Sequence, residues 1–195
     1  MDIKSAYEIA MEKVDKIGEA SEEERLKWKY TPEGGKLAAN ILKEDIDIAR
    51  ELIKYEPKAA VYIVDEAVNT LLRNIVLPRT EINKLNNKRA MDGIKILKKD
   101  KTKTENILAQ MRRIFSHYNE QGEQQRRQAY RQVKEAFEAK VQQALQQQIG
   151  SAAGIKIDIE KQPQFQEEWR KVQNQLDSQY IKLLDEFKQE LLKIK

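Results

Sequence analysis

Residues 163–194 have the sequence PQFQEEWRKVQNQLDSQYIKLLDEFKQELLKI, and this stretch decides the fold. Apolar residues recur along it in steps of three and four, the spacing of one face of an α-helix. The apolar stripe consists of Phe165, Trp169, Val172, Leu176, Tyr180, Leu183, Phe187, Leu191 and Ile194. The steps between them form an eleven-residue repeat, which keeps the stripe nearly straight along the helix. The remaining positions are mostly polar or charged, so another apolar surface must cover the stripe.

The nearest helix that could cover it lies at residues 129–149. Its own stripe includes Val133, Phe137, Val141 and Leu145. A connection of about a dozen residues suits two antiparallel neighbours, and the pattern therefore predicts a long, coiled-coil-like helical hairpin. Isoleucines alternate with charged residues in the connection, which predicts a short extended segment at 154–160.

Glutamine marks where this C-terminal part begins. The first 109 residues contain none, and the last 86 contain eighteen. Thr102 followed by Glu105 has the capping-box pattern of a helix start close to this boundary. Residues 119–128 then lack apolar side chains, and Gly122 lies among them. The sequence leaves open whether residues 103–149 form one helix or break near Gly122.

The N-terminal part has its best core element between Pro57 and Pro78. Proline is favoured at the first position of a helix and ends a helix that precedes it. The predicted core face of this helix consists of Ala60, Val61, Val64, Ala67, Val68, Leu71, Leu72 and Ile75. We therefore predict an all-α protein, with an N-terminal helical bundle at 1–101 and a glutamine-rich hairpin at 102–195.

Further amphipathic segments complete the predicted bundle. A first helix has its apolar face between Ile3 and Ile17. The capping-box pair Ser21 and Glu24 then starts a second short helix, or a kinked continuation, that runs to about Tyr30. Thr31 and Pro32 have the pattern of a new helix start, from which one stripe continues to Ile53. A weaker helix follows between residues 82 and 97.

Composition excludes several classes of protein. Charged residues make up 35% of the chain and hydrophobic residues 40%, with a net charge of +4 and no cysteine. The chain therefore has no disulfide, cysteine zinc site or catalytic thiol, and it is not strongly polycationic. No apolar run suits a signal peptide or a bilayer span, so we expect a cytoplasmic protein.

The sequence shows no set of residues suited to catalysis, a cofactor or a metal ion. His117 is the only histidine, and its neighbours in sequence include no partner that would make it a general base. The carboxylates Glu44, Asp45, Asp47 and Glu51 lie near lysines and arginines that can pair with them. Two glycines and a lysine at 34–36 lack the spacing of a phosphate-binding loop.

The sequence therefore favours a non-enzymatic interaction or assembly protein, a scaffold or adaptor that binds a protein partner or itself. The predicted seam or partner face consists of Phe165, Trp169, Val172, Leu176, Tyr180, Leu183, Phe187 and Leu191. The alternative is RNA or DNA binding, because residues 112–134 have a net charge of +4. Its contact residues would be Arg112, Arg113, Arg126, Arg127, Arg131 and Lys134. No small-molecule substrate is evident.

Overall fold

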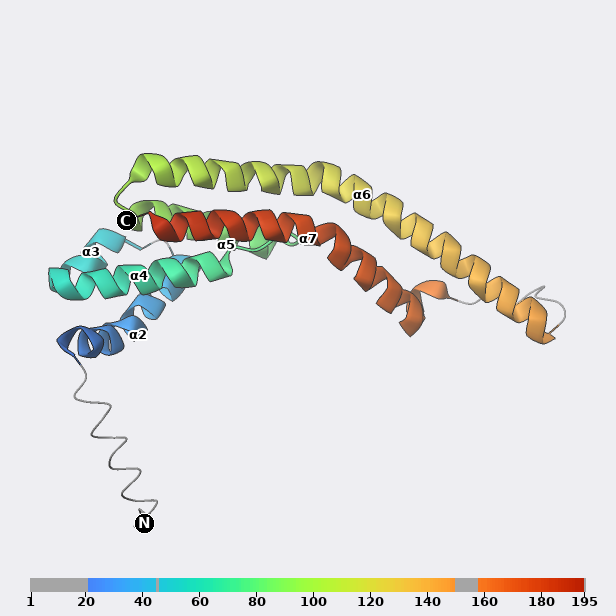
Figure 1. Ribbon diagram of the computed structural model, residues 1–195, viewed down its shortest axis with the longest axis horizontal. Coiled ribbons are helices and arrows are strands. Elements are labelled where there is room, and N and C mark those ends of the chain that lie inside the picture. Colours follow the sequence, from blue (N-terminus) through green and yellow to red (C-terminus); the bar gives the residue numbers. More distant parts are fainter. Residues whose placement is uncertain (1–20, 45, 150–157, 195) are drawn as a thin grey trace, which may run out of the picture.

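The computed structural model of the chain describes residues 21–44, 46–149 and 158–194, and these residues contain helices and no strand. The elements in order are α2 (Glu22–Lys43), α3 (Ile48–Ile53), α4 (Pro57–Asn74), α5 (Glu81–Leu97), α6 (Lys101–Ile149), the 3₁₀ turn η1 (Ile159–Lys161) and α7 (Pro163–Lys193). Helices α2 to α5 gather at one end of an elongated molecule, and α6 and α7 extend away from them (Figure 1). The predicted all-α fold is confirmed, and the helix predicted at residues 3–17 lies outside the described residues.

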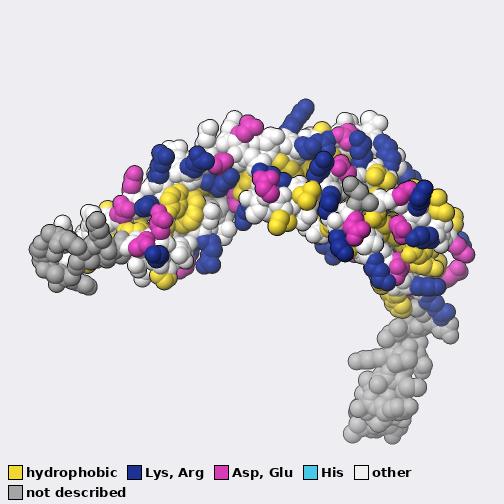
Figure 2. All heavy atoms as spheres, turned by 180° about the vertical axis from the view of Figure 1, so that it is seen from behind, with side chains coloured by type: hydrophobic (Ala, Val, Ile, Leu, Met, Phe, Trp, Pro, Cys, Tyr) yellow, Lys and Arg dark blue, Asp and Glu magenta, His cyan; other side chains and the backbone are white. Residues whose placement is uncertain are grey.

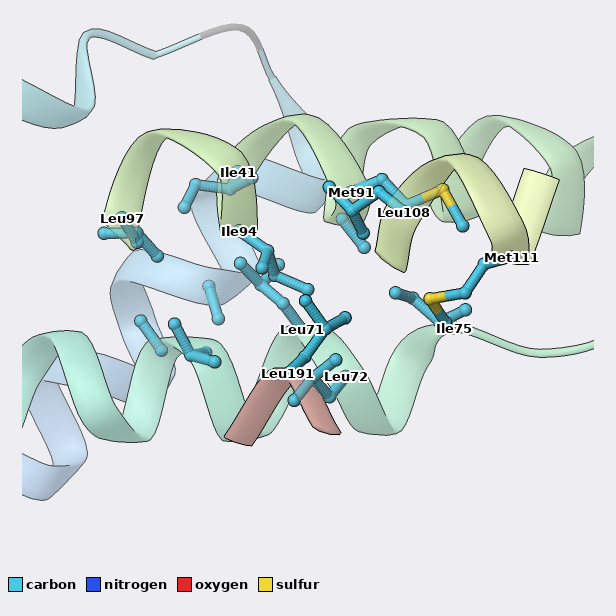
Figure 3. Packing of buried hydrophobic residues seen from close by; sticks show 14 of the residues in the cluster. Ile41, Leu71, Leu72, Ile75, Met91, Ile94, Leu97, Leu108, Met111 and Leu191 are labelled. Carbon is cyan, nitrogen blue, oxygen red and sulfur yellow. The ribbon is translucent and has the colours of Figure 1, made fainter. Parts of the chain in front are cut away.

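Helix α4 lies in the main hydrophobic core, where Ile63, Ala67 and Leu71 are at most 1% exposed. Side chains from the six helices α2 to α7 meet in this cluster, including Ile41, Leu71, Met91, Ile94, Leu108, Met111 and Leu191 (Figure 3). Each large apolar side chain buried there stabilises the fold by about 1.5–3 kcal/mol. The core thus contains residues from both sides of position 101, and the division into domains at that position stays a prediction.

Helix α2 begins at the predicted capping box and then differs from the prediction. The Ser21 N–H donates to Glu24 Oε2 at 2.9 Å, and the Glu24 N–H donates to Ser21 Oγ at 3.2 Å. The predicted new helix start at Thr31–Pro32 is wrong, because α2 continues through Pro32 to Lys43. The C-terminal half of α2 buries Gly34, Leu37, Ala38 and Ile41, and this packing offsets the hydrogen bond lost at the proline.

The predicted single helix reaching Ile53 is also wrong. Helix α2 ends at Lys43, and α3 begins separately, with Asp47 Oδ1 accepting a hydrogen bond from the Arg50 N–H at 3.1 Å. Aspartate at this position competes with continued helix by capping a new one. Arg89 Nη1 of α5 donates to the carbonyls of Leu42 and Lys43, at 2.7 and 2.9 Å, and so satisfies the end of α2.

Helix α4 begins at Pro57 as predicted but ends at Asn74, before Pro78 is reached. The side chain of Asn87, which is 2% exposed, satisfies the backbone beyond that end. Its Oδ1 accepts from the Val76 N–H at 3.0 Å, and its Nδ2 donates to the Val76 carbonyl at 2.7 Å. A buried amide on α5 thus holds an extended connection that periodicity assigned to α4.

Helix α6 is 49 residues long and passes Gly122 without a break. Its first turn is capped by Asp100, whose Oδ1 accepts from the Lys103 N–H at 3.0 Å, and not by the predicted Thr102. Residues 154–157 of the predicted extended segment lie outside the described residues. Further on, Ile159–Lys161 form a 3₁₀ turn, so the extended prediction is wrong there.

Helix α7 runs antiparallel to α6, as ring contacts at two levels show. The Tyr130 and Phe165 ring centroids are 5.7 Å apart, and those of Tyr118 and Tyr180 are 5.2 Å apart. Where α7 ends, the buried Lys98 donates from Nζ to the Ile194 carbonyl. None of the helices in the described ranges has the length and apolar character needed to cross a membrane.

Candidate interaction groove between the two long helices

A groove of about 710 Å³ opens between α6 and α7. It is lined by Arg113, Ile114, His117 and Gln125 of α6 and by Val172, Gln175, Leu176, Gln179, Tyr180 and Leu183 of α7. Apolar side chains thus alternate with neutral amides, and the only lining residues that can carry a charge are an arginine and a histidine. No carboxylate of the described residues lines this groove.

The groove lies where the apolar pattern of α7 has only a partial match on α6, because Ile114 is the one apolar residue of α6 among those that line it. Residues 119–128 of α6 contain no large aliphatic or aromatic side chain, and only Gln125 from this stretch lines the groove. Val172 and Leu176 of α7 lie along the same groove and are only half-buried. An apolar face of α7 is therefore left open where its neighbour is polar.

The predicted stripe residues differ widely in burial. Phe165 and Leu191 are buried, whereas Leu183 is 44% exposed. The other five are half-buried: Trp169, Val172, Leu176, Tyr180 and Phe187. The buried positions of α7 also include Asp177 and Leu184, which the stripe did not contain.

Asp177 is the centre of a buried polar layer beside the groove. Its side chain is 3% exposed, and its Oδ2 accepts from Arg79 Nη2 at 2.5 Å and from the Tyr118 hydroxyl at 3.4 Å. Its Oδ1 has no hydrogen-bond partner within the described part of the chain, and Arg126 Nη1 lies 4.0 Å from it. Arg79 comes from the α4–α5 connection, so the layer joins the bundle to both long helices.

Aromatic rings complete this layer and reach the groove. The Arg126 guanidinium lies 4.0 Å from the centre of the Tyr118 ring, and Tyr118 meets Tyr180 edge to face. The Tyr180 hydroxyl lies 2.9 Å from His117 Nδ1. Burial raises the pKa of the Tyr118 phenol, and the Asp177 charge raises it further, so the phenol stays a hydrogen-bond donor.

Gly122 permits the close contact of the two helices at this level. A Cβ atom added there would lie 3.1 Å from both the Tyr180 hydroxyl and Arg126 Nη1. The sequence marked this glycine as a possible helix break. The structure uses its missing side chain for packing instead.

The six basic residues predicted for nucleic-acid contact are mostly engaged within the chain. Arg112 pairs with Glu105, Arg127 with Glu123, and Lys134 with Glu160 at 2.7 Å. Arg126 belongs to the Asp177 layer. Among the described residues, Arg113 and Arg131 have no ion pair. Figure 2 shows cationic and acidic side chains interspersed over the face that it presents.

The other candidates also have structural partners. Asp47 caps α3, Glu51 pairs with Lys54 at 2.7 Å, and Glu44 lies 3.6 Å from Lys43. Asp45 lies outside the described residues, and the described part of the chain holds no group of acids and histidines arranged for a metal ion. Residues 34–36 lie inside α2, so they offer no free helix start.

Sequence reasoning missed Asp177, Arg79 and Leu184. A signal for two of them was present, because Asp177, Leu184 and Leu191 are spaced by seven residues, the repeat of a coiled-coil seam. An aspartate in such a row suggests a buried, paired carboxylate. Nothing near Arg79 in the sequence connects it with Asp177, which is 98 positions away.

Comparison with known proteins places the chain in a family. A family model described as "Family of unknown function (DUF6657)" matches residues 49–193, from α3 to the last residue of α7. No curated protein and no solved structure shows significant similarity to the chain. Because the match covers well over half of the sequence, the chain belongs to the DUF6657 family.

Proposed function

We propose that this protein is a non-enzymatic interaction protein that binds an amphipathic helix of a partner protein in the groove between α6 and α7. The observation that carries this proposal is the open apolar line of Val172, Leu176 and Leu183 along the groove. The first two lie beside the stretch of α6 at 119–128, which has no apolar residue. Laying an amphipathic helix into such a groove is a common mode of peptide recognition, with anchors spaced by three and four residues.

Charge indicates which helix fits. The groove presents Arg113, for which the described residues provide no ion pair, and His117, and it presents no carboxylate. A partner helix with acidic residues beside its apolar anchors complements this lining, whereas a basic helix would bring like charges together. Gln175 and Gln179 can donate to and accept from polar groups at the rim.

A pair of neighbouring substitutions tests the proposal. Leu183 is 44% exposed and Leu184 is 2% exposed, although both follow Tyr180 on one helix. We expect Leu183→Asp to change the free energy of unfolding in urea by no more than about 0.5 kcal/mol, because the charge remains solvated. Leu184→Asp should unfold the α6–α7 packing, since it buries an unpaired charge.

Binding is measured with two fluorescent 18-residue probe peptides that carry leucines at i, i+4, i+7 and i+11. One peptide has glutamates beside the leucines and the other has lysines. We expect the acidic peptide to bind the unsubstituted protein and to lose at least tenfold in affinity for folded Leu183→Asp. Equal binding to both proteins would contradict the proposal. The other possible occupant of the groove is a second copy of the chain, which light scattering over a concentration series would detect. A molecular mass that rises with concentration, and no longer does so in Leu183→Asp, would show that the groove mediates self-association and would overturn the acidic partner.

Nucleic-acid binding remains the alternative, with less support because four of its six residues have partners within the chain. It requires an affinity for mixed RNA or DNA that falls steeply as salt rises, since phosphate contacts release counterions. Arg131→Gln would weaken such binding without affecting a helix bound in the groove, because Arg131 does not line it. Arg113→Gln would weaken both kinds of binding and therefore does not separate them.

A further inference from the structure

A second groove, of about 480 Å³, lies between α5 and α6 and shares no lining residue with the first. This volume is within the range of sites that hold small molecules. Its lining includes Pro78, Met91 and Phe115, and the last two are 3% and 9% exposed. The groove therefore has an apolar floor that belongs to the main core.

Positive charge surrounds this floor. Lys84, Lys88 and Lys95 of α5 and Arg112 of α6 line the groove, against the acids Asp92 and Glu105. Four cations minus two carboxylates leave a net charge of +2 around one cavity. A groove with one dominant sign of charge and low-dielectric walls attracts ions of the opposite sign.

Glu105 shows that these cations can bind a carboxylate. Lys95 Nζ lies 2.9 Å from one of its oxygens, and Arg112 Nη2 pairs with the other. One carboxylate is thus shared by cations from two helices. The hydrogen bond from Lys95, with that from Arg112, lowers the pKa of Glu105.

Two further lysines of the groove, Lys88 and Lys84, are weakly neutralised by the described residues around them. Lys88 has no ion pair among the described residues, and it lies one helical turn from Met91 on the groove side of α5. Within the described ranges Lys84 pairs with Glu81 alone, at 2.7 Å, and the Glu81 side chain is 87% exposed, so that pair is weak. Both ammonium groups can therefore bind a ligand without breaking a buried contact.

We propose that the α5–α6 groove binds a small organic anion, a carboxylate or phosphate attached to a flat apolar group. The apolar group packs on Met91 and Phe115, and the acidic group binds Lys88 together with Lys95 and Arg112. This site is independent of partner binding in the α6–α7 groove.

Naphthalene-2-carboxylate is a suitable probe, and its neutral carboxamide is a matched control of nearly the same shape. We expect the full-length protein to bind the carboxylate about tenfold more tightly than the carboxamide, measured by titration of backbone amide NMR signals. The perturbed signals should come from residues 84–95 and 105–119. Added salt should weaken binding of the carboxylate and leave the affinity for the carboxamide unchanged.

Two substitutions with opposite expected effects separate binding from mere stability. Lys88→Gln removes a cation that has no ion pair among the described residues, and it should weaken binding of the carboxylate about threefold to fivefold. Glu105→Gln releases Lys95 and Arg112 from their internal carboxylate and should strengthen binding by a similar factor. Lys182→Gln removes an exposed lysine that lines neither groove and should change nothing.

Equal affinity for carboxylate and carboxamide would overturn the proposal, as would perturbations centred on Leu183 and Arg113. Loss of binding in Glu105→Gln with the fold retained would also overturn it, because the internal carboxylate would then assist the ligand. The unsubstituted protein and the three variants should have the same free energy of unfolding in urea within about 0.5 kcal/mol, since the substituted residues are exposed or half-exposed.

Discussion

At the scale of single residues, Asp177 is a buried carboxylate that links α7 to α6 and to the α4–α5 connection. A carboxylate in the core is costly unless cations and hydrogen bonds compensate it. Arg79, Tyr118 and Arg126 surround it from the α4–α5 connection and from α6, but the residues that the structure describes give one of its oxygens no hydrogen bond. The layer thus fixes the register between α6 and α7 at some expense in stability, the usual effect of a polar group in an apolar seam.

The pair formed by Arg79 and Asp177 gives a test at this scale. Arg79→Met leaves a buried carboxylate without its closest cation, and we expect a loss of about 2 kcal/mol in urea unfolding. This is less than for a fully buried pair, because the Arg79 side chain is 54% exposed and water screens it. The double substitution Arg79→Met with Asp177→Leu should recover most of the loss. Equal instability in the single and double variants would show that Arg79 acts through its own packing.

At the scale of elements, α2 shows how packing outweighs local signals. Pro32 and the glycines at 34 and 35 are all unfavourable inside a helix. The helix nevertheless continues, because Gly34 brings α2 against the backbone of α4. A Cβ atom at Gly34 would lie 2.5 Å from the Ile63 carbonyl oxygen and 2.8 Å from Cβ of Glu66. At Gly35 a Cβ atom would meet nothing within 4 Å.

These adjacent glycines should respond to alanine with opposite signs. Gly35→Ala gains helix propensity without a clash and should stabilise the protein by about 0.5–1 kcal/mol. Gly34→Ala forces backbone atoms of two helices apart and should destabilise it by more than about 2 kcal/mol. Urea midpoints of both variants, measured against the unsubstituted chain, check the signs. Stabilisation by Gly34→Ala would mean that α2 does not approach α4 this closely.

At the scale of the whole molecule, two separate hydrophobic clusters divide the stability. The main core joins the bundle to the near half of α6 and α7. The distal cluster consists of Phe137, Ile159 and Phe165, with Tyr130, Val133 and Val141 packed against it. Its flanking ion pairs, Lys134–Glu160 and Lys140–Glu168, are exposed enough to contribute little. A small cluster at the end of two long helices should therefore open before the core unfolds.

Hydrogen exchange measures this order directly. We expect Phe165→Ala to lower the opening free energy of amides in residues 130–145 and 163–170 by about 3 kcal/mol. Amides near Leu71 should keep their protection. The matched change Leu71→Ala should lower the protection of both regions, because it weakens the core on which global unfolding depends. Loss of protection throughout the chain in Phe165→Ala would show that the two clusters unfold as one unit.

Much of the fold was predictable because it depends on local rules. The Ser21–Glu24 capping box, the helix start at Pro57 and the all-α class follow from side chains that act on their own backbone. The errors arose where a distant residue decides. Ending α4 early depends on Asn87, and ending α2 at Lys43 depends on Arg89, each of which bonds to a backbone group on another element.

The candidate groove was predictable only in part, for a geometric reason. The apolar stripe of α7 and the polar stretch of α6 are both visible in the sequence, so an uncovered face could be suspected. One stripe was assumed for one seam, but the C-terminal half of α7 packs against the bundle as well as α6, and this buries Leu184 and Leu191. With Leu184 facing the bundle, its neighbour Leu183 lies at the open edge of the groove.

The sequence by itself determined the helical class, the solvated character of the long helices and the absence of cysteine chemistry, because these depend on composition and periodicity. Tertiary structure alone decided that α2 passes through Pro32, that Asp177 is buried against Arg79, and which apolar face of α7 stays open. These outcomes depend on contacts between residues far apart in the chain, whose free energies exceed the local preferences that oppose them.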